Sequence, residues 1–151
     1  MRFTLDTNIL VYALERQNDA KHRAARDLVR QARTRDCVIT LQTLGELFRT
    51  LTRKVRMPPA EAVAAVHDWR SAVPIVAADE ACLTDARDAA VGHHLSFWDA
   101  MLWATAKHAG CRVLLSEDGD DGRTLGGVTL VNPFASARSP LLAQVLGRRQ
   151  R

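Results

Sequence analysis

The sequence predicts an α/β fold with a central parallel β-sheet flanked by α-helices on both faces. Five short apolar runs, the expected strands, alternate with segments whose apolar residues recur at helical spacing, which is typical of such sheets. The 151 residues are enough for one domain that buries roughly two-thirds of its unfolded surface. An apolar fraction of 47% with 25% charged residues is ordinary for a globular protein, so global disorder is not expected.

The expected strands are short, and the first, with the apolar Phe3 and Leu5, is expected to be buried. They are residues 2–6, 37–41, 74–78, 112–116 and 128–131. Helical periodicity, the prolines at 58 and 59, an N-cap at Asp79 and a stop at Gly110 define the expected helices. They are residues 7–15, 20–34, 43–55, 59–71, 79–91 and 96–109.

The chain divides into a predicted domain of residues 1–135 and a basic C-terminal tail of residues 136–151, with a short helix around 140–146. The polar segment 117–127 is expected to be a loop. No apolar run approaches the roughly 20 residues needed to span a bilayer, and no signal-peptide pattern opens the chain. We therefore expect a cytoplasmic protein with no membrane contact. Cys37 and Cys111 begin apolar runs and are expected in the core.

Charge is distributed unevenly along the sequence. Residues 1–60 carry 12 Lys and Arg against 6 Asp and Glu, whereas residues 61–146 carry 6 against 11. The second expected helix has a basic face, here called the basic face of residues 21–35, and Arg148, Arg149 and Arg151 follow at the C-terminus. Such a balance suits a protein that binds a polyanion and also gathers carboxylates, and both basic regions are candidate contact surfaces for a polyanion.

Two carboxylates follow expected strands. Asp6 closes the first strand, and Asp118 comes just after the strand at residues 112–116. The carboxyl ends of parallel strands form the edge at which open α/β sheets bind ligands, so the two side chains are expected to lie close together. The alternatives are a helix N-cap for Asp6 and a polar turn residue for Asp118.

Two further acidic residues lie on expected helices. Asp99 follows Ser96 by three residues, a capping-box spacing, yet aromatic residues precede it. Glu46 falls at the border of the apolar face of its helix, where a solvated glutamate is the alternative. Four carboxylates brought together would repel one another unless a hard cation such as Mg²⁺ or Mn²⁺ bound there. Divalent ions held in this way stabilise the oxygens that attack and leave in phosphodiester cleavage.

The order of these motifs resembles that of the PIN-domain nucleases. The motifs are LDTN at residues 5–8, Glu46, FWDA at 97–100 and LLSED at 114–118. The length and the ending GGVTLVNPF at residues 126–134 resemble most the VapC-type toxins of bacterial type II toxin–antitoxin systems. The resemblance covers residues 2–134 and implies a PIN-like fold.

The resemblance also implies a site. Asp6 and Asp99 would hold Mg²⁺, with Mn²⁺ as a possible substitute, and Glu46 and Asp118 would complete the catalytic and metal-binding set. Glu117 remains open as an alternative to Asp118, since both follow the same strand. By the same resemblance, polar side chains would orient ligands or water. They are Thr7, Asn8 and Ser116.

The implied function is a toxin-type endoribonuclease that hydrolyses RNA with a metal-activated water, is silenced by an antitoxin protein and forms a homodimer. The alternatives are a housekeeping RNA-processing nuclease and a non-catalytic domain that binds RNA or protein. A phosphoryl-transfer enzyme with Asp6 as nucleophile is disfavoured, because position 8 is Asn where that chemistry usually has a second carboxylate.

Overall fold

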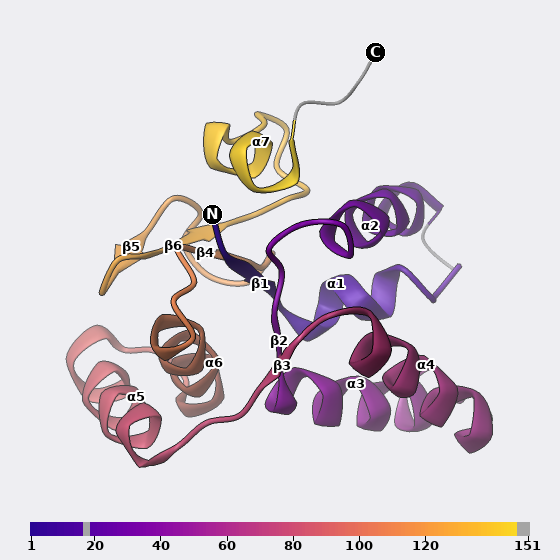
Figure 1. Ribbon diagram of the computed structural model, residues 1–151, viewed down its shortest axis with the longest axis horizontal. Coiled ribbons are helices and arrows are strands. Elements are labelled where there is room, and N and C mark those ends of the chain that lie inside the picture. The colour runs from indigo at the N-terminus through magenta and orange to yellow at the C-terminus, as the bar shows by residue number, and fades with distance from the viewer. Residues whose placement is uncertain (17–18, 148–151) are drawn as a thin grey trace.

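A computed structural model describes residues 1–16 and 19–147, and its centre is a four-stranded sheet with the order β1–β4–β6–β5 (Figure 1). Strands β1, β4 and β6 run parallel, and β5 runs antiparallel to β6. The four strands are β1 (Phe3–Leu5), β4 (Val113–Leu115), β5 (Thr124–Leu125) and β6 (Val128–Val131).

A second, two-stranded parallel sheet joins β2 (Ile39–Thr40) to β3 (Ile75–Val76). A parallel bridge between Phe3 and Cys37 places this sheet beside β1. Strand β1 therefore has β4 on one side and the β2–β3 pair on the other. Parallel α/β sheets bind ligands in a crevice at the carboxyl ends of their strands. The crevice forms where the chain continues from neighbouring strands to opposite sides of the sheet.

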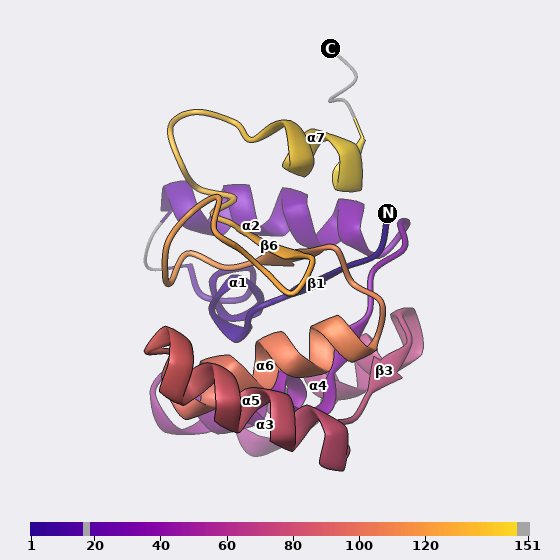
Figure 2. The same ribbon diagram turned by 90° about the vertical axis from the view of Figure 1, so that its left-hand side faces the viewer.

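Seven helices lie in the described part of the chain, and Figure 2 shows the sheet between α2 and α7 on one side and α3, α5 and α6 on the other. The predicted α/β class with helices on both faces is therefore confirmed. The helices are α1 (Thr7–Tyr12), α2 (Asp19–Ala32), α3 (Leu41–Arg53), α4 (Pro59–Ala72), α5 (Glu80–His93), α6 (Phe97–His108) and α7 (Pro140–Leu146). No helix among the described residues is long and apolar enough to cross a membrane.

The central strands are buried on both faces. All three residues of β1 and of β4 are buried, and Phe3, Leu5 and Leu115 have no exposed surface. Complete burial of each such side chain stabilises the fold by about 1.5–3 kcal/mol. Continuous apolar runs, rather than alternating ones, are what strands covered by helices on both faces require.

Several predicted bounds are wrong; the helix expected at residues 7–15, for example, ends at Tyr12. Two other differences have a clear local cause. The strand expected at residues 37–41 ends at Thr40, because the Thr40 hydroxyl accepts a hydrogen bond from the amide of Thr43 and so starts α3 at Leu41. The expected loop 117–127 contains β5. Gly126 and Gly127, with φ of 54° and 80°, form a two-residue turn between β5 and β6, and positive φ at both positions is a geometry that matches the twist of a tight hairpin.

All three cysteines are buried, as expected for Cys37 and Cys111. Burial raises the pKa of each of these two thiols to about 12. At neutral pH they are therefore protonated and act as small apolar side chains.

The helix α7 lies at the range expected for it, and it packs on α2. Ser139 caps its first turn, with its hydroxyl accepting from the amide of Leu141 at 3.2 Å. Leu142, Val145 and Leu146 are buried in the main core cluster. The predicted boundary between residues 135 and 136 stays a prediction, and the C-terminal arginines lie outside the described residues.

We expect Leu142→Ala to lower the free energy of unfolding by about 2–5 kcal/mol, because it leaves a cavity under α7. Gln144→Ala, on the exposed face of the same helix, is the control and should change it by less than about 0.5 kcal/mol. Urea denaturation measures both. Equal midpoints for the two variants would show that α7 does not contribute to the core.

Candidate active site

Asp6 joins the end of β1 to the start of α1. Its Oδ1 accepts a hydrogen bond of 2.6 Å from the amide of Thr7, and its Oδ2 accepts one of 2.8 Å from the Ser116 hydroxyl. The N-cap alternative is therefore correct for one carboxylate oxygen. The other oxygen accepts from Ser116, which follows β4. Helix capping alone does not require this second contact.

Asp118 lies at the same edge of the sheet. Its amide donates to the Ser116 hydroxyl at 3.1 Å, and its Oδ2 accepts from Asn8 Nδ2 at 3.2 Å. Ser116 thus contacts both Asp6 and Asp118, and Asn8 extends from the first turn of α1 toward the loop after β4. The structure brings these two acidic residues together, as the parallel arrangement of β1 and β4 predicts.

Glu117, the alternative to Asp118, is engaged elsewhere. Its carboxylate accepts hydrogen bonds from the Tyr12 hydroxyl and, at 2.6 Å, from Lys21 Nζ. Burial alone would raise the pKa of Glu117, but these two donors outweigh it and lower the pKa. Glu117 therefore ties the loop after β4 to α1 and α2, while Asp118 lines the cleft described below.

Asp99 lies in the first turn of α6. Ser96 caps this helix through its hydroxyl, which accepts from the Asp99 amide at 3.3 Å. A capping box would also need the Asp99 carboxylate to accept from the Ser96 amide. No hydrogen bond from the Ser96 amide to the Asp99 carboxylate occurs among the described residues. The Asp99 carboxylate therefore lines the cleft and can bind a ligand there.

Glu46 reaches the site indirectly. Its two oxygens accept hydrogen bonds of 2.8 Å from Thr7 Oγ1 and from Gln42 Nε2, and Gln42 also donates to the Trp98 carbonyl at 3.0 Å. Glu46 is half-buried and does not line the cleft itself. Sequence reasoning missed Gln42, although its position one helical turn before Glu46 is a signal that the two can bond.

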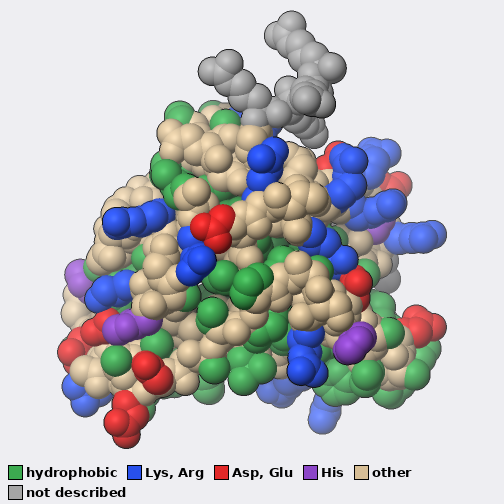
Figure 3. All heavy atoms as spheres, viewed as in Figure 1, with side chains coloured by type: hydrophobic (Ala, Val, Ile, Leu, Met, Phe, Trp, Pro, Cys, Tyr) green, Lys and Arg blue, Asp and Glu red, His purple; other side chains and the backbone are tan. Residues whose placement is uncertain are grey.

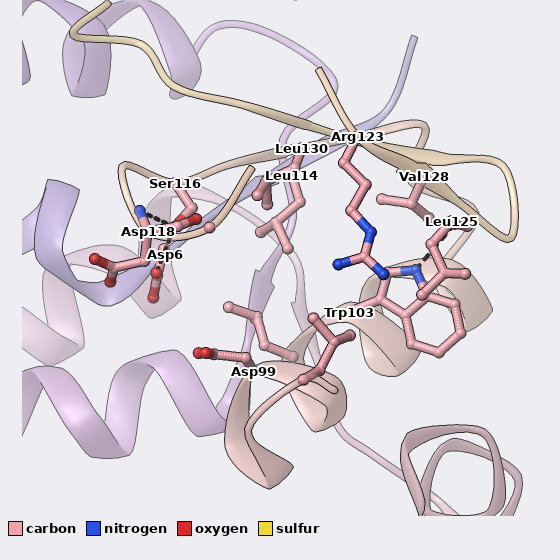
Figure 4. Close-up of a pocket in the computed structure, with 13 residues that line it drawn as sticks. Asp6, Asp99, Trp103, Leu114, Ser116, Asp118, Arg123, Leu125, Val128 and Leu130 are labelled. Carbon is pink, nitrogen blue, oxygen red and sulfur yellow. Dashed lines mark hydrogen bonds between the residues drawn. The ribbon is translucent and has the colours of Figure 1, made fainter. Parts of the chain in front are cut away.

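A cleft lies between the sheet and α6, and Figure 4 shows its two unlike ends. Asp6, Asp99 and Asp118 form the acidic end. The other end combines Arg123 with apolar side chains, which are Leu95, Leu102, Trp103, Leu114, Leu125, Val128 and Leu130. Of the four predicted site residues, the structure therefore gathers three in one cleft and connects the fourth through Thr7.

The acidic end is electrostatically strained. Burial raises the pKa of Asp6, and the charges of Asp118 and Asp99 raise it further. The hydrogen bonds from Ser116 and Thr7 only partly offset these effects. A cation bound beside Asp6 would remove this cost, since it favours the charged carboxylate.

The donor atoms suit Mg²⁺ or Mn²⁺, because they are carboxylate oxygens. Within residues 1–16 and 19–147, no group of three acidic, His or Cys side chains is arranged tightly enough to enclose an ion. Mg²⁺ does not need such an enclosure, since it keeps several waters and binds proteins through one or two carboxylates. Asp6 and Asp99, from two elements that face the same cleft, fit this mode.

Most of the basic face of residues 21–35 lies on α2, where Figure 3 shows Lys and Arg side chains gathered at the surface, and Arg33 and Arg35 follow the end of this helix. Part of this charge has structural partners. Lys21 bonds Glu117, and Arg33 bonds Asp68 at 2.5 Å and lies over the Trp69 ring. A groove beside α2 is lined by basic residues, which are Arg23, Arg26, Arg30 and Arg33.

The fold and the acidic cleft define a class: α/β domains that place carboxylates at the carboxyl ends of parallel strands. Within this class the chain belongs to the PIN-domain family, whose model matches residues 3–124. No curated protein matches the chain.

Solved structures show the same fold. VapC20 of Mycobacterium tuberculosis, described as a sarcin–ricin loop cleaving toxin, has a TM-score of 0.66 at 22% identity, over 78% of this chain and 91% of that one. A toxin–antitoxin complex from Klebsiella pneumoniae has 0.62 at 21%, over 87% and 97%. VapBC2 of Rickettsia felis, bound to a DNA fragment from its promoter, has 0.63 at 17%, over 86% and 97%.

We expect Asp6→Asn to raise the melting temperature of metal-free protein at pH 7. A carboxylate with a raised pKa contributes stability below its unfolded pKa of about 3.9 and loses it as the pH rises through the folded value. Asn keeps the acceptor for Thr7 without the charge, so the gain should vanish toward pH 3. Differential scanning fluorimetry with a chelator measures this.

Asp88→Asn, at an exposed position of α5, is the matched control and should leave the melting temperature unchanged. If Asp6→Asn instead melts lower than wild type at pH 7, the carboxylate charge stabilises the fold. In that case the hydrogen bonds from Ser116 and Thr7 outweigh the burial of the carboxylate and its repulsion by the neighbouring acidic side chains.

Proposed function

We propose that this chain is a cytoplasmic, toxin-type endoribonuclease that hydrolyses RNA phosphodiester bonds with Mg²⁺, or Mn²⁺ in its place. The observation that carries the proposal is the convergence of Asp6, Asp99 and Asp118, from three separate segments, on one cleft. Burial, with the charges of Asp118 and Asp99, raises the pKa of Asp6 and makes its charged form costly without a ligand, and such sites are commonly functional.

In this proposal Asp6 and Asp99 hold the ion, and Glu46 and Asp118 complete the acidic set. A divalent ion held there would supply positive charge to neutralise the phosphate and to activate water. The chain itself orients the carboxylates. Ser116 positions Asp6 by direct hydrogen bonding, and Thr7 and Gln42 do the same for Glu46. Asn8 positions Asp118.

The toxin assignment is supported by the proteins whose folds match. One is described as a toxin that cleaves the sarcin–ricin loop, and others were crystallised as toxin–antitoxin complexes. We infer that this chain also has an antitoxin partner, which would place an apolar helix in a groove between helices and a basic side chain near the carboxylates. A homodimer stays a prediction.

A groove between α3 and α4 suits the apolar helix of such a partner. Leu41, Phe48 and Val63 line it and are 56%, 39% and 57% exposed. Apolar side chains exposed side by side mark surfaces that bind other proteins. The proposed partner would cover this groove and so remove apolar surface from water.

We expect purified protein to cleave RNA with Mg²⁺ or Mn²⁺ and to lose this activity on chelation. Asp118→Asn should lower the rate by about 10- to 100-fold, since the loss of a side chain that supports the metal ligands typically costs that much in metal affinity or activity. Gel mapping of the ends produced from structured RNAs measures both.

The matched control is Glu117→Gln, one residue away. It should cleave at the wild-type rate once its melting temperature shows that it is folded, because Glu117 bonds Tyr12 and Lys21 outside the cleft. Full activity after exhaustive chelation would end the metal hypothesis. RNA that is bound but uncut would favour the non-catalytic alternative.

We expect expression of the chain alone to arrest cell growth, with Asp6→Asn relieving the arrest. The reason is that an active toxin without its antitoxin degrades cellular RNA. Growth curves with matched protein levels, checked by immunoblot, measure the effect. Normal growth at high levels of an enzyme that is active after purification would support the housekeeping alternative.

A further inference from the structure

The apolar end of the cleft has no part in holding a metal ion. Leucine and valine side chains from the sheet and α6 line it, and Trp103 and Arg123 lie among them (Figure 4). Pockets that are mostly apolar with a few placed polar groups are typical of sites that orient a flat organic ligand. This end opens directly toward Asp6 and Asp99, so a ligand in it would adjoin the candidate reaction site.

The backbone of Arg123 is held firmly, but its side chain has only weak partners. The Arg123 amide donates to Asp120 O at 3.0 Å, and its carbonyl accepts from Leu130 at 2.8 Å. The guanidinium lies 3.4 Å from the His93 carbonyl and 3.8 Å from the Asp120 carboxylate. Normal N–H···O hydrogen bonds measure 2.7–3.2 Å, so most of its five donors remain able to bind a ligand.

Trp103 provides a fixed flat surface at the same end. Its indole Nε1 donates to the Leu125 carbonyl at 3.0 Å, which orients the ring against the β5–β6 hairpin. Gly126 permits this close approach, because a Cβ there would come within 3.0 Å of the ring. Lys107 Nζ lies 5.4 Å from the centroid of the ring, and Trp103 still lines the cleft, where an aromatic surface can stack on a nucleobase.

Gly119 keeps the cleft continuous between Asp118 and Arg123. Its φ is +86°, and a Cβ would lie 2.9 Å from a methyl carbon of Leu130. Any larger residue would therefore push Leu130 away or fill the space between the acidic and apolar ends.

We propose that the apolar end of this cleft is a nucleobase subsite for guanine, recognised by the Arg123 guanidinium. The inference rests on the proposed ribonuclease function and names the nucleotide next to the cleaved bond. Arg recognises guanine through two parallel hydrogen bonds to O6 and N7, the commonest base-specific contact of this side chain.

A base suits this position better than a phosphate. Three carboxylates stand at the other end of the same cleft and disfavour a second anion beside them. Sites for phosphate usually gather several cations or backbone amides, whereas Arg123 is the one Lys or Arg among the described residues that line this cleft. A neutral ring with two acceptors fits apolar walls and a single fork-shaped donor.

The test is equilibrium binding of labelled RNA octamers by fluorescence anisotropy, in chelator and at several salt concentrations. The octamers are oligouridylate with one central G, A or C. Wild type should prefer the G octamer over the A octamer by about 5- to 150-fold, the ratio that corresponds to the 1–3 kcal/mol of a bidentate base contact. Arg123→Gln should bind all three octamers alike.

Arg123→Lys keeps the positive charge but cannot make two parallel hydrogen bonds to guanine. It should therefore lose most of the preference for the G octamer while the salt slope stays at the wild-type value. Arg87→Gln, an exposed arginine on α5, is the matched control and should retain the full preference. Melting temperatures confirm that each variant is folded.

Three results would overturn the subsite. The first is a wild type without base preference, and the second is an Arg123→Gln variant that keeps the preference. The third is an Arg123→Gln variant that binds all octamers, G included, more weakly by the same factor, with a slope of log affinity against log salt shallower by about 0.7. That result would mean that Arg123 contacts a phosphate. Because binding is measured without metal, base-selective binding without cleavage in Mg²⁺ would refute the ribonuclease function alone.

Discussion

One hydroxyl group connects the two halves of the candidate site. Ser116 is 4% exposed, and its Oγ donates to Asp6 while accepting from the Asp118 amide. This is possible because Leu5 and Leu115 are paired in the parallel register of β1 and β4, which sets the next residues of both strands side by side. A shift of one residue would reverse every side chain of β4 and separate the carboxylates.

The surrounding core supports a site that is unfavourable by itself. Asp6 is half-buried near two other carboxylates, and it follows a strand whose residues are all buried. Large apolar contacts in β1 and β4 therefore offset the local electrostatic cost. Proteins commonly keep such destabilised clusters where they bind a ligand, because a site optimised for stability would hold neutral side chains instead.

Local patterns predicted much of the fold and the four acidic positions. Helical periodicity located α2 and α3, and the apolar runs located β1 and β4, because both signals arise within a few residues. Glu117 could not be separated from Asp118, since that choice depends on contacts with Tyr12 and Lys21 far away in the sequence. Arg123 was missed for the same reason: only the hairpin places it in the cleft.

The rates at which a thiol reagent labels the buried cysteines report internal motion of the protein. Cys82 belongs to the small cluster between α5 and α6, whereas Cys37 packs in the main core beside β1. A thiol reagent can reach either one only when its surroundings open. Labelling of Cys82 at a faster rate than Cys37 would thus reveal that α5 separates from α6, the helix that carries Asp99, while the rest of the domain remains folded.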